Sequence, residues 1–163
     1  MANGFDVNNL SRGDQIIGVS GIVLFIFSFF DWLGAKVPGT AISGADSAWG
    51  FTLTLIAVLI GIAMLVYVVL KAMGVDMPNL GNVTWAQVLL VAAGIAFLFV
   101  LIKLIAGPHI DTAGFDVNID KTRKFGIFIG LIATAGLVFG AWLNYQAGTA
   151  GGGTRPAGGG PAA

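Results

Sequence analysis

Two ionisable residues stand within the long apolar stretches of this sequence, Asp31 and Lys103. An ionisable side chain costs about 2.5–3.5 kcal/mol at the centre of a membrane-spanning helix, so such residues are candidates for functional sites. Both lie near the ends of their stretches, where a lysine side chain can extend to water. We expect them to form a structural ion pair within the membrane. Two separately solvated charges, or a proton or ion path, are the alternatives.

Other residues that could carry chemistry are sparse. The chain has no cysteine, no glutamate and one histidine, His109, which follows Pro108 in an expected loop. This excludes thiolate metal sites, cysteine nucleophiles and multi-histidine metal sites. The sequence also lacks a phosphate-binding loop, a dinucleotide fingerprint and a nucleophile motif. We therefore predict that the protein is not an enzyme and has no catalytic, cofactor-binding or metal-binding residues.

The composition indicates an integral membrane protein. Of the 163 residues, 56% are hydrophobic and 10% are charged, and the mean hydropathy is +0.90. Soluble domains carry about 25% charged residues. The net charge is zero, which gives no basic field for nucleic acid. The expected partner is therefore the lipid bilayer, with no nucleic acid.

Four apolar runs are long enough to cross a membrane, since about 20 helical residues span the hydrocarbon core. They predict an all-α fold, a compact bundle of four transmembrane helices within residues 1–145, with no strands beyond a short loop hairpin. The Gly/Ala/Pro-rich residues 146–163 are expected to form a flexible tail. The predicted spans cover about residues 12–33, 48–70, 85–105 and 122–144.

Residues at the span ends support these boundaries. Ser11 with Asp14, and Thr84 with Gln87, have the spacing of capping boxes, and Asp120 and Ser47 are further candidate caps. Tryptophan favours the membrane interface, and all four tryptophans lie at span ends. The expected interfacial anchors are Trp32, Trp49, Trp85 and Trp142.

Small residues recur at helical spacing within the spans, and such residues let helix backbones approach closely in a membrane. We expect them to pack the four helices of one chain together, with a homodimer face as the alternative. The fourth span carries Gly126, Gly130, Ala133, Gly136 and Gly140, the second Ala57 and Gly61, and the third Ala92 and Ala96.

An even number of spans places both termini on one side of the membrane. The apolar part of the first span follows a polar segment, which is unlike a secretory signal. Both termini are therefore expected in the cytoplasm. The basic residues near span ends favour the opposite orientation, because the loops at 34–48 and 106–124 contain Lys36, Lys121, Arg123 and Lys124.

One short motif occurs twice. The segment Gly-Phe-Asp-Val-Asn at 4–8 recurs at 114–118, shortly before the first and the fourth predicted spans. An inverted duplication, as in transporters, would explain both copies. Two interfacial segments anchored by Phe5 and Phe115 would explain them without duplication.

The order of several short motifs resembles a known group. Ser11-Arg-Gly-Asp is followed by Phe27-Ser-Phe-Phe-Asp-Trp-Leu-Gly34, by Ala48-Trp49 and by the Gly/Pro-rich end. This order resembles small four-helix membrane proteins of actinobacteria, most of which have no assigned activity. The resemblance implies a plasma-membrane location and no catalytic residues.

Three functions are consistent with the sequence. The favoured one is a non-catalytic structural, accessory or scaffolding membrane protein that binds other membrane proteins or itself. The alternatives are a small pore-forming or holin-like oligomer and a transporter subunit. A pore needs a polar stripe along a helix, but Thr52 and Thr54 cluster near one span end and Thr134 stands alone.

Overall fold

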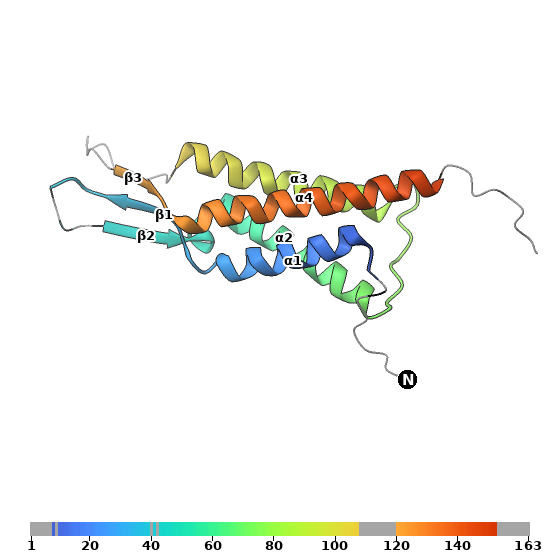
Figure 1. The fold of residues 1–163 in the computed structure, drawn as a ribbon. Helices are drawn as coiled ribbons and strands as arrows, with labels where there is room; N and C mark the ends of the chain where they lie inside the picture. Colours follow the sequence, from blue (N-terminus) through green and yellow to red (C-terminus); the bar gives the residue numbers. More distant parts are fainter. Residues whose placement is uncertain (1–7, 9, 40, 42, 108–119, 153–163) are drawn as a thin grey trace, which may run out of the picture.

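A computed structural model describes residues 8, 10–39, 41, 43–107 and 120–152. These residues form four helices, a short 3₁₀ helix and one small antiparallel sheet (Figure 1). The helices are α1 (Arg12–Phe27), α2 (Thr52–Ala72), α3 (Trp85–Ala106) and α4 (Phe125–Gly152). The strands are β1 (Asp31–Lys36), β2 (Ser43–Ser47) and β3 (Asp120–Arg123), and the 3₁₀ helix is η2 (Ala48–Gly50).

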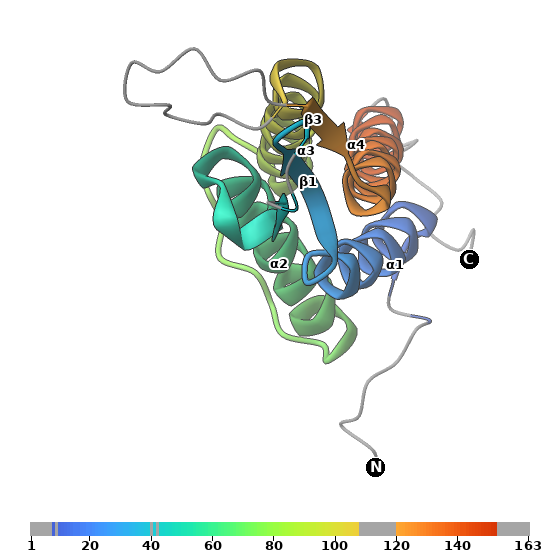
Figure 2. The ribbon, with the colours of Figure 1, turned by 90° about the vertical axis from the view of Figure 1, so that its left-hand side faces the viewer.

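The four helices pack side by side in a closed ring. Helix α4 contacts α1 and α3, and α2 contacts the same two helices from the other side. Viewed from the sheet end, β1 lies in front of the ring of helices (Figure 2), and Figure 1 shows the sheet at that end of the bundle. The interior is filled by fully buried apolar side chains such as Ile17, Leu24, Val58 and Leu137. The bundle is therefore filled by side chains along its axis.

The outward faces of the helices are apolar as well. Large hydrophobic side chains such as Val91, Ile105 and Ile132 are more than 60% exposed. Three helices are long and apolar enough to cross a membrane: α2, α3 and residues Phe125–Gly148 of α4. A helix that is apolar on all sides suits a membrane span, where lipid covers its outer face.

The first helix is shorter than the predicted span of 12–33. Helix α1 has 16 residues and ends at Phe27, and the chain has entered β1 by Asp31. The indole Nε1 of Trp32 donates a hydrogen bond to the Phe27 carbonyl oxygen at 2.8 Å, which folds the chain back against the helix end. Hydropathy alone does not detect this turn, because residues 25–30 are as apolar as the helix before them.

A three-stranded sheet replaces the irregular loops expected at one end of the bundle. Its strand order is β2-β1-β3, with both pairs antiparallel. Gly34 of β1 lies opposite Ala45 of β2 and Thr122 of β3. The prediction of no strands beyond a short hairpin is therefore wrong. Strands this short carry too few alternating residues to be recognised from periodicity.

The helix ends confirm some predicted caps and correct others. Both capping boxes form: the backbone N of Asp14 donates to Ser11 Oγ at 3.1 Å, and that of Gln87 to Thr84 Oγ1 at 3.3 Å. Asp120 belongs to β3, and Ser47 precedes η2 without a side-chain cap bond.

Helix α4 differs from its predicted span at both ends. It begins at Phe125, later than 122, because the residues before it pair with β1, and it continues to Gly152, past the predicted boundary at 145. Residues 146–152 are thus helical, and 153–163 lie outside the described part of the chain.

Candidate functional site

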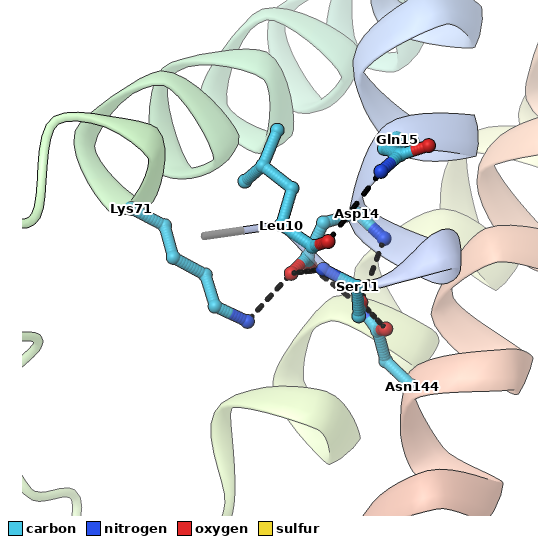
Figure 3. A network of polar contacts seen from close by, with 6 residues as sticks. All are labelled: Leu10, Ser11, Asp14, Gln15, Lys71 and Asn144. Atoms are coloured by element: carbon cyan, nitrogen blue, oxygen red, sulfur yellow. Dashed lines mark hydrogen bonds and ion pairs between the residues drawn. The ribbon is translucent and has the colours of Figure 1, made fainter. Parts of the chain in front are cut away.

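Four polar residues meet where α1 begins and α2 ends (Figure 3), which is the end of the bundle opposite the sheet (Figure 1). The Asp14 side chain is fully buried, and its Oδ2 lies 2.6 Å from Lys71 Nζ. Asn144 Nδ2 donates to Asp14 Oδ1 at 2.6 Å, and Ser11 N donates to Asp14 Oδ2 at 3.2 Å. Ser11 Oγ donates to Asn144 Oδ1 at 2.5 Å. We call Ser11, Asp14, Lys71 and Asn144 the polar tie.

The polar tie connects three helices. Asp14 lies in the first turn of α1 and Lys71 in the last turn of α2, so each charge also suits the dipole of its own helix. Asn144 comes from α4, whose backbone approaches α1 closely here. A Cβ atom at Gly140 would lie 2.6 Å from the Gly13 carbonyl oxygen. Glycine at both positions therefore brings Asn144 within reach of Asp14.

The polar tie satisfies the buried carboxylate of Asp14. Both carboxylate oxygens of Asp14 accept hydrogen bonds, and Lys71 supplies the balancing charge. Buried charges are costly unless they are paired and hydrogen-bonded in this way. The arrangement holds α1, α2 and α4 together.

The contacts of the polar tie are not predicted by the sequence. From the sequence, Asp14 is expected as part of a capping box, and residue 144 is the end of the fourth predicted span. The sequence contains two signals: the amide of Asn144 at the end of a glycine stripe, and Asp14 in place of the usual Glu or Gln of a capping box. Neither signal predicts the contact partner, because Asp14 is separated from Lys71 by 57 positions and from Asn144 by 130.

The two charged residues first expected to pair do not form an ion pair here. Asp31 is exposed at the start of β1, opposite Ser47. Lys103 is buried in the last turn of α3, with its Nζ 4.5 Å from the centroid of the Phe51 ring. Among the described residues, the ion pair within 4 Å is that of Lys71 with Asp14. A cation over an aromatic face is itself favourable.

The structure predicts that Asp31 and Lys103 contribute independently to stability. Asp31→Asn, Lys103→Met and the double variant are compared by thermal unfolding in detergent. The two single effects should add to within about 0.5 kcal/mol, as they do for residues without direct contact. A coupling energy of about 1 kcal/mol or more would instead show that the two charges pair.

Three other buried hydroxyl groups donate hydrogen bonds to backbone carbonyl oxygens. Ser28 Oγ donates to Phe25 O at 2.6 Å, Thr54 Oγ1 to Ala48 O at 2.7 Å, and Thr134 Oγ1 to Gly130 O at 2.9 Å. In the described part of the chain, every buried side-chain nitrogen or oxygen has a partner. Ser28 Oγ also accepts a hydrogen bond from Trp49 Nε1 at 3.1 Å, which joins the end of α1 to η2.

The glycine stripe of α4 faces α1 and the start of β1. A Cβ at Gly126 would lie 2.6 Å from the Asp31 carbonyl oxygen, and one at Gly130 would lie 2.6 Å from Trp32 Cζ2. Gly136 faces Ser20, whose Cβ would be 3.2 Å away, and Ala133 is buried. The stripe therefore makes close contacts within one chain.

The other predicted packing residues lie mostly in the interior. Ala57, Gly61 and Ala96 are buried, and a Cβ at Gly61 would lie 2.5 Å from Leu24 Cδ2 of α1. Ala92 is only partly buried, while its neighbour Ala93 is fully buried. The buried face of α3 thus runs through Ala93 and Ala96.

Trp32 is not an interfacial anchor. Its side chain is fully buried against the glycines of α4, since Gly126 and Gly130 leave room for the indole ring. The other three predicted anchors are partly exposed: Trp49, Trp85 and Trp142.

Aromatic side chains gather at both ends of the bundle. At the sheet end, Phe29 stacks on Trp49 with ring centroids 5.7 Å apart, and Phe30 and Phe125 are more than half exposed. At the opposite end, Tyr67 lies against Trp85 at 5.4 Å, and Trp142 against Tyr145 at 5.9 Å. Aromatic rings at both ends of apolar helices are typical of membrane interfaces.

Comparison with known proteins identifies no relative. No protein-family model matches the chain, and no curated protein matches its sequence.

Some residues singled out in the sequence lie outside the described part of the chain. These are His109, the second copy of the repeated motif at 114–118, and residues 4–7 of the first copy. Within the described residues, no three His, Cys, Asp or Glu side chains gather in a group that could hold a metal ion.

Proposed function

We propose that this chain is a non-catalytic, multi-pass protein of the plasma membrane that acts as a structural, accessory or scaffolding subunit. Its partners would be the lipid bilayer and other membrane proteins or further copies of itself. The observation that carries this proposal is the use of the buried polar groups: within the described residues they bond locally or tie helices together.

In this proposal α1 also crosses the membrane. Its 16 residues are about 24 Å long, shorter than the roughly 30 Å hydrocarbon core. The apolar turn at 28–30 extends the segment, and the exposed rings of Phe29 and Phe30 would then lie at the interface. Four crossings would place the start of α1 and the end of α4 on the same side.

A pore or transporter subunit is the competing function. Either one needs water or polar groups along a path through the protein, within one chain or between copies. The closed apolar interior provides no such lane in one chain. An oligomeric pore would need polar outward faces, whereas the exposed faces of α2 and α3 carry Val, Leu and Ile.

Site-specific photo-crosslinking in native membranes tests the proposal. A crosslinking amino acid is placed at Val91 on α3 and, as the matched position, at Ile132 on α4, which are 63% and 68% exposed. We expect a discrete protein adduct from one face and lipid adducts from the other. The purified chain in liposomes should show no ion flux. Ion flux would establish a pore instead, and lipid adducts at both positions would contradict the scaffolding role.

We further propose that both termini face the cytoplasm. Single cysteines at Gly44 and Gly148 test this, because both glycines are exposed with no atom within 4 Å of an added Cβ. A membrane-impermeant thiol reagent on intact cells should label Gly44→Cys and not Gly148→Cys. The reverse pattern would invert the orientation, and labelling of both would contradict an even number of spans.

A further inference from the structure

One face of the sheet forms a hollow of about 420 Å³ at the end of the bundle. Its lining includes Gly34 and Lys36 of β1, Thr122 of β3 and Lys124, which follows β3. Gly34 and Lys36 share one face because side chains alternate along a strand, and Thr122 lies opposite Gly34 on the same face. We call this feature the sheet hollow.

The chemistry of the sheet hollow suits an anion. It offers two ammonium groups and one hydroxyl, and Lys36 and Thr122 are exposed. Asp46 lies opposite Leu33 in the register, and Leu33 is on the other face of its strand from Gly34. Among the residues that line the hollow, Lys36 and Lys124 carry the charge. Phosphate oxygens bind such clusters of donors and positive charge.

Glycine at position 34 places Lys124 over the hollow. A Cβ atom there would lie 2.8 Å from Lys124 Cε, so the lysine stem occupies the space that any side chain at 34 would take. Lys124 is only half-buried. Its stem is therefore held against the sheet, which gives the charged end less freedom than a lysine in solvent has.

The location indicates the source of the anion. Lys124 directly precedes Phe125, which is 66% exposed at the start of the apolar helix α4, and Phe30, 53% exposed, directly precedes β1. The sheet hollow thus follows immediately on the exposed aromatic rings at this end. Within the membrane location proposed above, on which this step rests, that is the level of lipid phosphates.

We propose that the sheet hollow binds the phosphate of an anionic phospholipid headgroup. Lys36 and Lys124 supply the charge, Thr122 donates a hydrogen bond, and Gly34 leaves room for the stem of Lys124. The bound lipid would fix the depth of the sheet against the membrane surface. Free inorganic phosphate shares this chemistry, and the test below separates the two sources.

The test measures lipid retention by the full-length protein in detergent, using native mass spectrometry with phosphatidylglycerol or zwitterionic phosphatidylcholine. We expect preferential retention of phosphatidylglycerol. Affinity should fall about fivefold for each lysine replaced in Lys36→Gln and Lys124→Gln, from the usual contribution of a basic residue near anionic lipid. Arg12→Gln, which removes an exposed charge at the opposite end, should leave retention unchanged.

Gly34→Val provides a second variant that keeps both lysines. The added side chain displaces Lys124, so retention should fall while Lys36 and Lys124 stay present. Circular dichroism and thermal unfolding check that each variant is folded. Lys36→Gln changes only an exposed side chain, so it keeps the test decisive if another variant does not fold.

Two outcomes would overturn the proposal. Equal retention by the wild-type protein and a folded Lys36→Gln/Lys124→Gln double variant would show that the hollow binds no lipid. Displacement of the lipid by millimolar inorganic phosphate, with no preference for phosphatidylglycerol, would assign the hollow to a soluble anion. Neither result alters the crosslinking and flux results, so failure here is distinguishable from failure of the proposed function.

Discussion

Lys71→Met should lower the free energy of unfolding in detergent by about 3 kcal/mol, the lower end of the cost of breaking a buried ion pair. The substitution leaves the fully buried Asp14 carboxylate without its balancing charge. Two neutral donors, Asn144 Nδ2 and Ser11 N, still bond to it. The lower end applies because the Lys71 side chain is 37% exposed, so water partly replaces it.

Replacing Asp14 should lower the free energy of unfolding by less than replacing Lys71 does. Asp14→Asn removes the buried charge and keeps a carbonyl oxygen for Asn144, while Lys71 can turn toward water. The double variant Asp14→Asn/Lys71→Met should therefore be more stable than Lys71→Met alone. The coupling energy should fall within about 0.5–3 kcal/mol, as for residues in direct contact.

Denaturation of the four proteins in one detergent measures this cycle. Lys71→Arg, which keeps the charge, and Arg12→Met, which removes an exposed charge from the same end of the bundle, are the controls and should be mild. If Lys71→Met lowers the free energy of unfolding no more than Arg12→Met does, Lys71 does not stabilise the buried Asp14 carboxylate. The polar tie would then not be a structural unit.

Gly130→Ile should destabilise the protein by about 1–3 kcal/mol, the usual cost of overpacking a filled core. The new Cβ would lie 2.6 Å from Trp32 Cζ2, and the ring is fully buried, so neither side can yield without a backbone shift. Ala135→Ile places the same side chain on an exposed position of the same helix and should be mild.

Removing the ring tests the same contact from its other side. Trp32→Ala alone should cost about 3–5 kcal/mol, as other buried tryptophans do, because it empties the space between β1 and α4. In the double variant Trp32→Ala/Gly130→Ile the isoleucine enters that space. The double variant should therefore lose less free energy of unfolding than the two single variants lose together. Simple addition would show that Gly130 does not pack on Trp32.

Much of the fold follows from local features of the sequence. The second and third helices lie close to their predicted spans, because uninterrupted apolar runs of this length have few other stable forms in lipid. The capping boxes at Ser11 and Thr84 form as expected, since all their atoms lie within one turn. The glycine stripe of α4 packs within the chain, consistent with small residues at regular helical spacing.

The tertiary structure decides what depends on distant residues. It turns the chain after Phe27, buries Trp32 against Gly130 and pairs β1 with β3, whose partners Gly34 and Thr122 come from separate loops. It also joins Ser11 to Asn144 across 133 positions. Hydropathy and spacing report only on neighbours within a few turns, whereas these contacts depend on which faces of α1 and α4 approach each other. Only the assembled bundle determines that geometry, and with it the partner of Asp14 and the position of Lys124 over the sheet.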